Sequence, residues 1–132
     1  KVPNTEQGAK AAFCAADQDK YWQYTHGIVP RIKTDYFDKG IGVKNVAVPK
    51  EIPLLPLSYF ETSAKNAGLD TAKFTDCMKG NSHQQEINGN TQKALSLGVN
   101  GLPYMVINDY QTSGFAGGES GLKAILKAGG VN

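Results

Sequence analysis

The sequence predicts a helix-rich α/β fold, in which several helices come first, a β-hairpin follows and one helix closes the chain. Three observations support this prediction. Apolar residues recur at three- and four-residue spacing over much of residues 7–97. A short run of strand formers, Tyr104–Ile107, precedes the turn signal Asn108-Asp109. A last amphipathic stretch over residues 119–127 lies between two glycine pairs.

The first helix is predicted over about residues 7–25, which are rich in alanine and contain no proline. Its apolar stripe is predicted to consist of Ala9, Ala12, Phe13 and Ala16. Asp17 and Asp19 interrupt the apolar pattern, so a bend or a break near them stays open. Gly27 and Pro30 are expected to end the helix.

Residues 28–57 are punctuated by glycine and proline, which makes long regular elements unfavourable there. Only a helical turn at Tyr36-Phe37 and a short strand over residues 43–48 are predicted. Three helices follow, each with a glycine at its end. They are predicted as Tyr59–Ala67 with Ser58 as N-cap, Thr71–Lys79 with Asp70 as N-cap, and a helix from Asn81 or Ser82 to Leu97.

The charge balance excludes the strong positive potential that would attract nucleic acid or anionic lipid. Fourteen Lys and Arg residues against twelve Asp and Glu give a net charge of +2. Arg31 is the single arginine, although nucleic-acid readers depend on the guanidinium group. No apolar run reaches the roughly 20 residues of a membrane span. We therefore predict no nucleic-acid partner and no membrane span.

The Tyr104–Ile107 run is apolar at nearly every position, which is typical of a strand covered on both faces. A lone two-stranded hairpin is only marginally stable in water. We therefore expect the other strands of this sheet to lie outside the sequence. The chain begins at Lys1 without an initiator methionine, and we interpret it as a piece cut from something larger.

Cys14 and Cys77 are the two cysteines, and they lie 63 positions apart. No Cys-x-x-Cys is present, and no Cys and His cluster has zinc spacing. The residues alone leave two alternatives open, a pair of buried free thiols or one long-range disulfide. We predict no metal site and no cofactor.

The remaining ring-bearing candidates have ordinary structural explanations. His26 is expected near a helix end, where an imidazolium suits the helix dipole. His83 is expected to be exposed in a first helical turn. Tyr21, Trp22 and Tyr24 are expected to pack in a core more readily than to form a ligand platform.

Several segments are informative because of the order in which they occur along the chain. They are residues 11–16 followed by 20–24, 67–70 before 73–77, 91–99 leading into 101–103, and 104–108 with 113–118. In this order they resemble the second part of the DsbA-like thioredoxin-fold thiol–disulfide oxidoreductases. The resemblance implies a partial thioredoxin-like fold, with residues 1–98 as the helical insertion and 99–132 as cis-proline loop, hairpin and C-terminal helix. The opening strands and the redox CxxC of the family are missing from this sequence.

The resemblance also implies roles for particular residues. Cys14 and Cys77 match helices that carry a second, non-catalytic disulfide in some relatives. Leu102-Pro103 matches the cis-proline loop, so Gly101, Leu102 and Pro103 are implied to bind substrate. Leu102 departs from the Thr or Val that many relatives place before this proline. No catalytic residue is expected in this chain, because the family's redox chemistry belongs to the CxxC.

The function implied is a portion of a thiol–disulfide oxidoreductase that supplies a helical lid and a substrate loop. Its partners would be protein or peptide thiols, and its location extracytoplasmic, either periplasmic, secreted or at a bacterial cell surface. The alternative is a non-catalytic peptide-binding or scaffold module of thioredoxin-like fold. A homo-oligomer or strand exchange could complete the sheet in either case.

Overall fold

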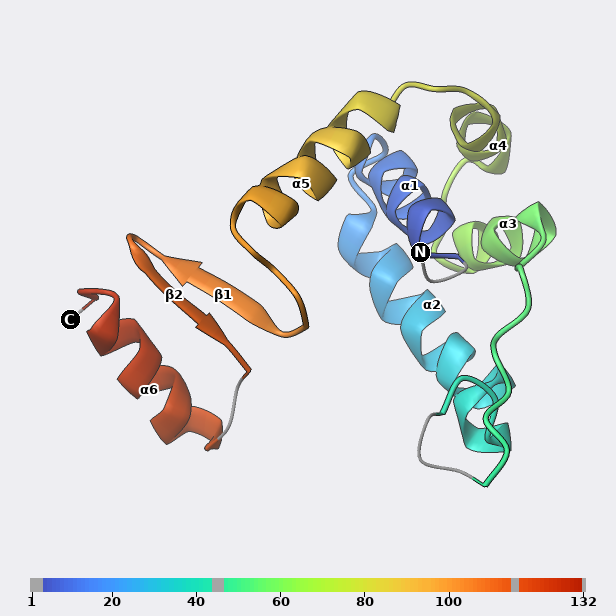
Figure 1. Ribbon diagram of the computed structural model, residues 1–132. Helices are drawn as coiled ribbons and strands as arrows, with labels where there is room; N and C mark the ends of the chain where they lie inside the picture. The colour runs from blue at the N-terminus through green and yellow to red at the C-terminus, as the bar shows by residue number, and fades with distance from the viewer. Residues whose placement is uncertain (1–3, 44–46, 115–116, 132) are drawn as a thin grey trace. The chain divides into compact units, whose positions relative to one another are not determined.

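The computed structural model describes residues 4–43, 47–114 and 117–131, and the chain divides into two compact units between Ile87 and Asn88. The helix-rich α/β fold predicted from the sequence is confirmed (Figure 1). The elements are α1 (Thr5–Ala16), α2 (Tyr21–Asp35), η1 (Phe37–Lys39), α3 (Leu57–Asn66), α4 (Thr71–Lys79), α5 (Gln84–Ser96), β1 (Tyr104–Ile107), β2 (Tyr110–Ser113) and α6 (Gly118–Ala128). In the described ranges, none of the helices has both the length and the apolar content needed to cross a membrane.

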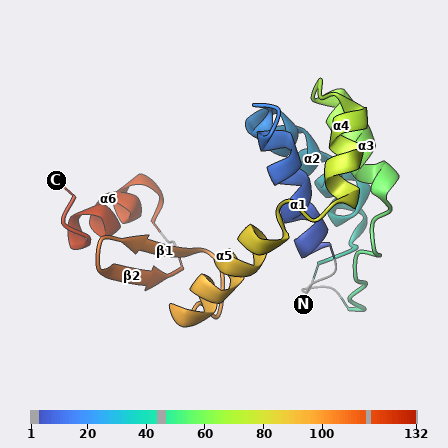
Figure 2. The same cartoon turned by 90° about the horizontal axis from the view of Figure 1, so that it is seen from above.

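The first unit has its core among α1, α2, α3 and α4, which lie side by side in both ribbon views (Figures 1 and 2). Tyr24, Phe60, Phe74 and Cys14 are its largest fully buried side chains. The Tyr24 and Phe74 rings lie 5.5 Å apart and so join α2 to α4. Burial of apolar side chains, aromatic ones among them, between the four helices stabilises this unit.

The helix predicted over residues 7–25 is two helices, and the break falls where Asp17 and Asp19 interrupt the apolar pattern. Asp19 adopts a left-handed backbone with φ of 57°. The expectation that Gly27 and Pro30 end the helix is wrong, because α2 continues to Asp35. Proline removes one backbone donor, but Ile28 on the same helix is buried in the core. Tertiary packing thus outweighs the local cost of Pro30.

The apolar stripe predicted on α1 is also wrong by about one position. The buried residues are Ala11, Cys14 and Ala15, whereas Ala16 is exposed. The cause is composition: alanine occurs all around this helix, so periodicity alone does not select a face. Cys14 determines which face of α1 is buried, because its sulfur is bonded to the sulfur of Cys77 on α4.

The central segment matches its prediction in part. A helical turn is present at Phe37–Lys39, and Ile41 forms an isolated bridge with Lys50. The short strand predicted over residues 43–48 falls on 44–46, which lie outside the described residues. α3 begins at Leu57 with Pro56 as its N-cap, so the assignment of Ser58 as the cap is wrong. The backbone of Pro56 is extended, with φ of −69° and ψ of 156°, which is the conformation usual at an N-cap.

The second unit contains the hairpin and α6. β1 pairs antiparallel with β2, with Met105 opposite Thr112 and Ile107 opposite Tyr110. The returning strand was predicted over residues 112–116, but β2 covers Tyr110–Ser113, and 115–116 lie outside the described residues. Among the described residues from 88 onward, only Gly129 is buried. This unit therefore has no core comparable to that of the first.

Candidate functional site

The predicted substrate loop, Gly101-Leu102-Pro103, lies directly before β1 and is exposed throughout. Leu102 is 88% exposed, the largest fraction among the exposed large hydrophobic residues that the structure describes. The peptide bond between Leu102 and Pro103 is cis. The loop thus presents an apolar side chain and a proline ring to solvent at the start of a strand.

Three contacts fix the start of β1. The Pro103 carbonyl accepts a hydrogen bond from the Gly114 N–H at 2.8 Å. The Tyr104 hydroxyl lies 3.0 Å from the Leu97 carbonyl oxygen and 2.6 Å from Gln111 Oε1. The tyrosine therefore ties the end of α5 to both strands of the hairpin, which places the loop between two anchored segments.

The hydrogen-bonding pattern identifies which groups of β1 point away from β2. Hydrogen-bonded pairs alternate along an antiparallel ladder. Because the Pro103 carbonyl bonds to Gly114, the next such pairs are Met105 with Thr112 and Ile107 with Tyr110. The N–H and C=O groups of Tyr104 and Val106 hence point to the opposite edge, where no strand is present among the described residues.

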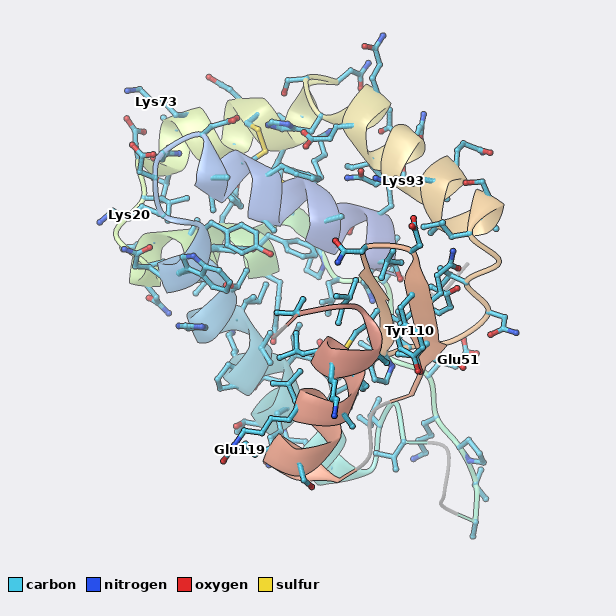
Figure 3. All side chains as sticks on the ribbon, turned by 90° about the vertical axis from the view of Figure 1, so that its left-hand side faces the viewer. Lys20, Glu51, Lys73, Lys93, Tyr110 and Glu119 are labelled. Atoms are coloured by element: carbon cyan, nitrogen blue, oxygen red, sulfur yellow. A yellow bond between two sulfur atoms is a disulfide. The ribbon has the colours of Figure 1, made fainter. Side chains whose placement is uncertain are left out.

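The two predicted disulfide residues lie in the first unit. Cys14 on α1 and Cys77 on α4 form a disulfide with a Cα–Cα distance of 5.8 Å, seen in Figure 3 as a yellow bond between the two helices. Cys14 is fully buried and Cys77 half-buried. The bond closes a loop of 63 positions, for which chain entropy gives up to about 4 kcal/mol of stabilisation.

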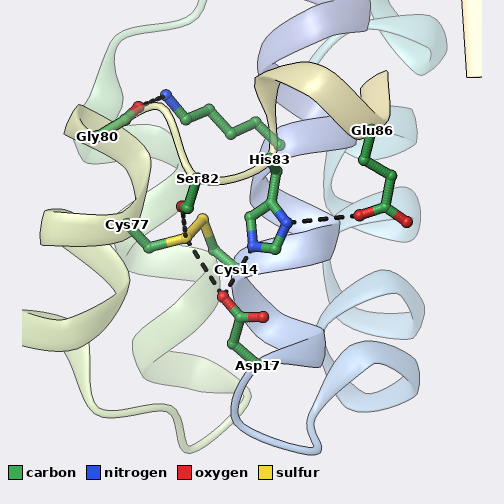
Figure 4. Close-up of polar contacts among 8 residues, drawn as sticks. Cys14, Asp17, Cys77, Gly80, Ser82, His83 and Glu86 are labelled. Carbon is green, nitrogen blue, oxygen red and sulfur yellow. Dashed lines mark hydrogen bonds and ion pairs between the residues drawn. A yellow bond between two sulfur atoms is a disulfide. The ribbon is translucent and has the colours of Figure 1, made fainter. Parts of the chain in front are cut away.

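A histidine that the sequence analysis placed in solvent lies beside this disulfide. The His83 side chain has only 14% of its surface exposed, and its ring stacks on Phe13 with centroids 5.3 Å apart. His83 Nε2 lies 2.8 Å from Asp17 Oδ2, and Nδ1 lies 3.6 Å from Glu86 Oε2 (Figure 4). The expectation of an exposed His83 is wrong because Phe13, one turn along α1 from Asp17, supplies a face for the ring.

The surroundings of Cys77 are polar on one side. Its sulfur lies 3.7 Å from Asp17 Oδ2 and 3.9 Å from Ser82 Oγ. A disulfide sulfur carries no proton, so the hydroxyl of Ser82 is the donor in the second contact. Lys10 Nζ donates to the Gly80 carbonyl at the end of α4. These contacts hold the segment between α4 and α5 against α1 (Figure 4).

The single arginine has a structural role that the sequence did not reveal. Arg31 Nη1 donates to the Tyr59 carbonyl at 2.9 Å and to Ser63 Oγ at 3.0 Å, and its guanidinium lies 3.8 Å from the centre of the Tyr59 ring. The Tyr59 hydroxyl donates to Asp35 Oδ2 at 2.9 Å. Burial, together with this hydrogen bond, raises the pKa of Tyr59 to about 12. Through its contacts with Tyr59 and Ser63, Arg31 joins α2 to α3.

The tyrosine and tryptophan group of α2 divides between core and surface. Tyr24 is buried, and burial raises the pKa of its hydroxyl well above the ordinary value. Trp22 is 66% exposed and lies beside His26, with ring centroids 5.6 Å apart. Core packing is thus confirmed for Tyr24 and wrong for Trp22 and for Tyr21, which is also exposed. His26 lies in the middle of α2, not at its end, because the helix extends to Asp35.

Comparison with known proteins assigns the chain to a family. The family model for the DSBA-like thioredoxin domain matches residues 1–126. A search of curated proteins gives no match. Because the family model covers nearly the whole chain, the chain belongs to the DSBA-like thioredoxin domain family, whose members are thiol–disulfide oxidoreductases.

Proposed function

We propose that this chain supplies the helical part and the substrate-binding loop of a thiol–disulfide oxidoreductase and carries no redox dithiol of its own. The observation behind the proposal is the exposed loop Gly101-Leu102-Pro103 leading into β1, whose Tyr104 and Val106 backbone groups point to an edge without a strand. An extended polypeptide that pairs with such an edge gains backbone hydrogen bonds. Leu102 would contact its side chains.

The proposed substrates are protein or peptide thiols in extended conformation. Backbone pairing is indifferent to sequence, which suits an enzyme that handles many unfolded chains. Leu102 offers an apolar contact, and apolar residues are what unfolded chains expose. The family assignment supports protein substrates and an extracytoplasmic location, where disulfides form and persist.

The disulfide of this chain is poorly suited to be the family's catalytic pair. A catalytic dithiol needs an attacking sulfur held as thiolate, usually at a helix N-terminus, with a resolving cysteine close in sequence. Cys14 is fully buried near the C-terminal end of α1, and Cys77 lies in the last turn of α4. We therefore propose that Cys14–Cys77 is structural and takes no part in substrate oxidation, and that the family's redox dithiol is not among these 132 residues.

A turnover assay tests this proposal. The oxidised chain is incubated with a reduced, unfolded protein that contains two cysteines and with oxidised glutathione, which re-oxidises any catalytic dithiol between turnovers, and substrate disulfide is measured over time. The control is the double variant Cys14→Ser/Cys77→Ser. We expect the two proteins to give the same rate. Repeated turnover by the unaltered chain, well above that of the double variant, would overturn the proposal.

The alternative of a non-catalytic peptide-binding or scaffold module rests on the same edge of β1. The two functions differ in whether a redox dithiol ever acts next to Pro103. The residues encoded ahead of Lys1 distinguish them. A Cys-x-x-Cys there would support the oxidoreductase, and a coding sequence without one would support the binding module.

A further inference from the structure

A second group of reactive side chains surrounds the disulfide of the first unit. The sulfur atoms of Cys14 and Cys77 and a ring nitrogen of His83 all lie within 4.8 Å of one another. Thiolate and imidazole are the donors that zinc prefers in proteins. Sequence spacing did not show this group, because its members come from α1, from α4 and from the segment before α5.

The carboxylate of Asp17 lies beside this group. Asp17 Oδ2 lies 2.8 Å from His83 Nε2 and 3.7 Å from Cys77 Sγ. Asp17 follows Cys14 by three residues, so both lie on one side of the chain at the end of α1. Two sulfurs, one imidazole nitrogen and one carboxylate oxygen make up the number of ligands in a tetrahedral zinc site.

A second carboxylate lies near the other ring nitrogen of the histidine. Its Nδ1 faces the Glu86 carboxylate at 3.6 Å, on the side away from Asp17 (Figure 4). A carboxylate at the second ring nitrogen fixes the tautomer and orientation of a zinc-bound histidine. The Phe13 ring stacked on His83 covers one face of the imidazole. The ring is thus held in place before any metal arrives.

We propose that the reduced form of the Cys14–Cys77 pair binds zinc, with Cys14, Cys77 and His83 as ligands and Asp17 in the fourth position. In the oxidised chain the sulfurs are bonded to each other and offer no thiolate. An external dithiol supplies two electrons and two protons, which breaks the S–S bond, leaves two protein thiols and converts the dithiol to its own disulfide. Zinc then displaces the two thiol protons to solvent.

The opening that zinc requires is small and falls on the less buried cysteine. Two zinc–sulfur bonds of about 2.3 Å at tetrahedral angles separate the sulfurs by about 3.8 Å. Cys14 is fully buried, whereas Cys77 is half-buried and borders the polar Ser82 side. Rotation of the Cys77 side chain therefore provides the space. Zinc would thus replace the disulfide as the cross-link between α1 and α4. This proposal does not depend on the function proposed for the Pro103 loop.

Cobalt titration of the whole chain tests the site. The chain is reduced with a phosphine, which does not compete as a dithiol would, and Co²⁺ is added without oxygen. We expect thiolate-to-cobalt charge-transfer absorption and the visible bands of tetrahedral Co²⁺, both abolished by stoichiometric Zn²⁺ and both absent from the oxidised chain. A reduced, helical chain that shows only the weak spectrum of aqueous Co²⁺ would overturn the proposal.

Matched variants assign the ligands. His83→Asn and Asp17→Asn should each weaken zinc binding to the reduced chain by at least about tenfold in a chelator competition. His26→Asn and Asp19→Asn, which replace the same residue types outside the group, should leave the affinity unchanged. An unaltered affinity in His83→Asn would contradict the assignment. So would a reduced chain whose helical circular dichroism is lost and is not restored by Zn²⁺.

Discussion

Gly129, which follows the last residue of α6, lies directly against the side chain of Ile107 at the end of β1. A Cβ atom placed at position 129 would lie 2.7 Å from the Ile107 Cβ, closer than real Cβ contacts. Next to this contact, Asn108 Nδ2 donates to the Gly129 carbonyl at 2.6 Å. The two contacts join the end of α6 to the hairpin in a unit that otherwise has little burial.

Gly129→Ala should therefore destabilise the second unit. Overpacking of this kind costs about 1–3 kcal/mol, and we expect amide hydrogen exchange in β1 to become faster by a corresponding factor. Gly89→Ala is the matched control, because nothing lies within 4 Å of a Cβ at that helical position. It should be neutral or slightly stabilising. Unchanged exchange in Gly129→Ala would contradict the packing described here.

Loss of the disulfide should destabilise the first unit. The double variant Cys14→Ala/Cys77→Ala removes a cross-link between α1 and α4, and the free energy of unfolding should fall by up to about 4 kcal/mol. Urea denaturation in the presence of a metal chelator measures the effect. The reduced, unaltered chain should show a similar loss under the same conditions. An unchanged midpoint in both would show that the helices are held without the bond.

Tyr59 gives the first unit a specific sensitivity to alkali. Its pKa rises from 10.0 to about 12 on folding because the hydroxyl is buried and donates to Asp35. The protonated form is favoured by folding, so the associated stability is present below pH 10 and is lost as the pH rises toward 12. Tyr59→Phe should lower stability at pH 7 by about 1 kcal/mol.

Tyr59→Phe should also reduce the amount of stability that the protein loses between pH 10 and pH 12. The measurement is the urea midpoint of both proteins across this interval. Tyr24 adds to the loss in each protein, because burial raises the pKa of its hydroxyl as well, so the slope should diminish without vanishing. A slope identical in Tyr59→Phe and the unaltered chain would contradict the buried Tyr59–Asp35 contact.

The sequence was sufficient to predict a helix end where that end depends on a few neighbouring residues. Asp70 was predicted as the N-cap of a helix over residues 71–79, and its side chain accepts from the N–H groups of Ala72 and Lys73 at 3.0 and 3.1 Å. The capping group and the segment that it caps are adjacent, so this prediction needed no knowledge of the fold.

Long-range packing decided what the sequence could not. The passage of α2 through Pro30 depends on contacts made by Tyr24 and Ile28 with other helices. The surroundings of His83 depend on Phe13 and Asp17, which precede it by 70 and 66 positions. Neither relationship leaves a pattern in the local sequence. The zinc site proposed above was missed for the same reason.

For the proposed substrate loop, the sequence placed Gly101, Leu102 and Pro103 before a strand, and the structure has β1 beginning at Tyr104. Their role in binding stays a prediction. Leu102→Ala should weaken binding of an extended, cysteine-containing peptide by about fivefold, because it removes roughly 1 kcal/mol of apolar contact. Leu54→Ala, which alters another exposed leucine outside the loop, should leave binding unchanged. Equal affinities of the two variants would contradict a role for Leu102.

The central claim is that extended polypeptides bind along β1 beside the loop. The most direct measurement is an amide NMR titration of the whole chain with an extended peptide that carries one blocked cysteine. We predict the largest shift changes at Leu102, Tyr104 and Val106, since the last two have backbone groups that point to the edge of β1 away from β2. Changes confined to residues 4–87, with β1 unaffected at saturating peptide, would contradict the account.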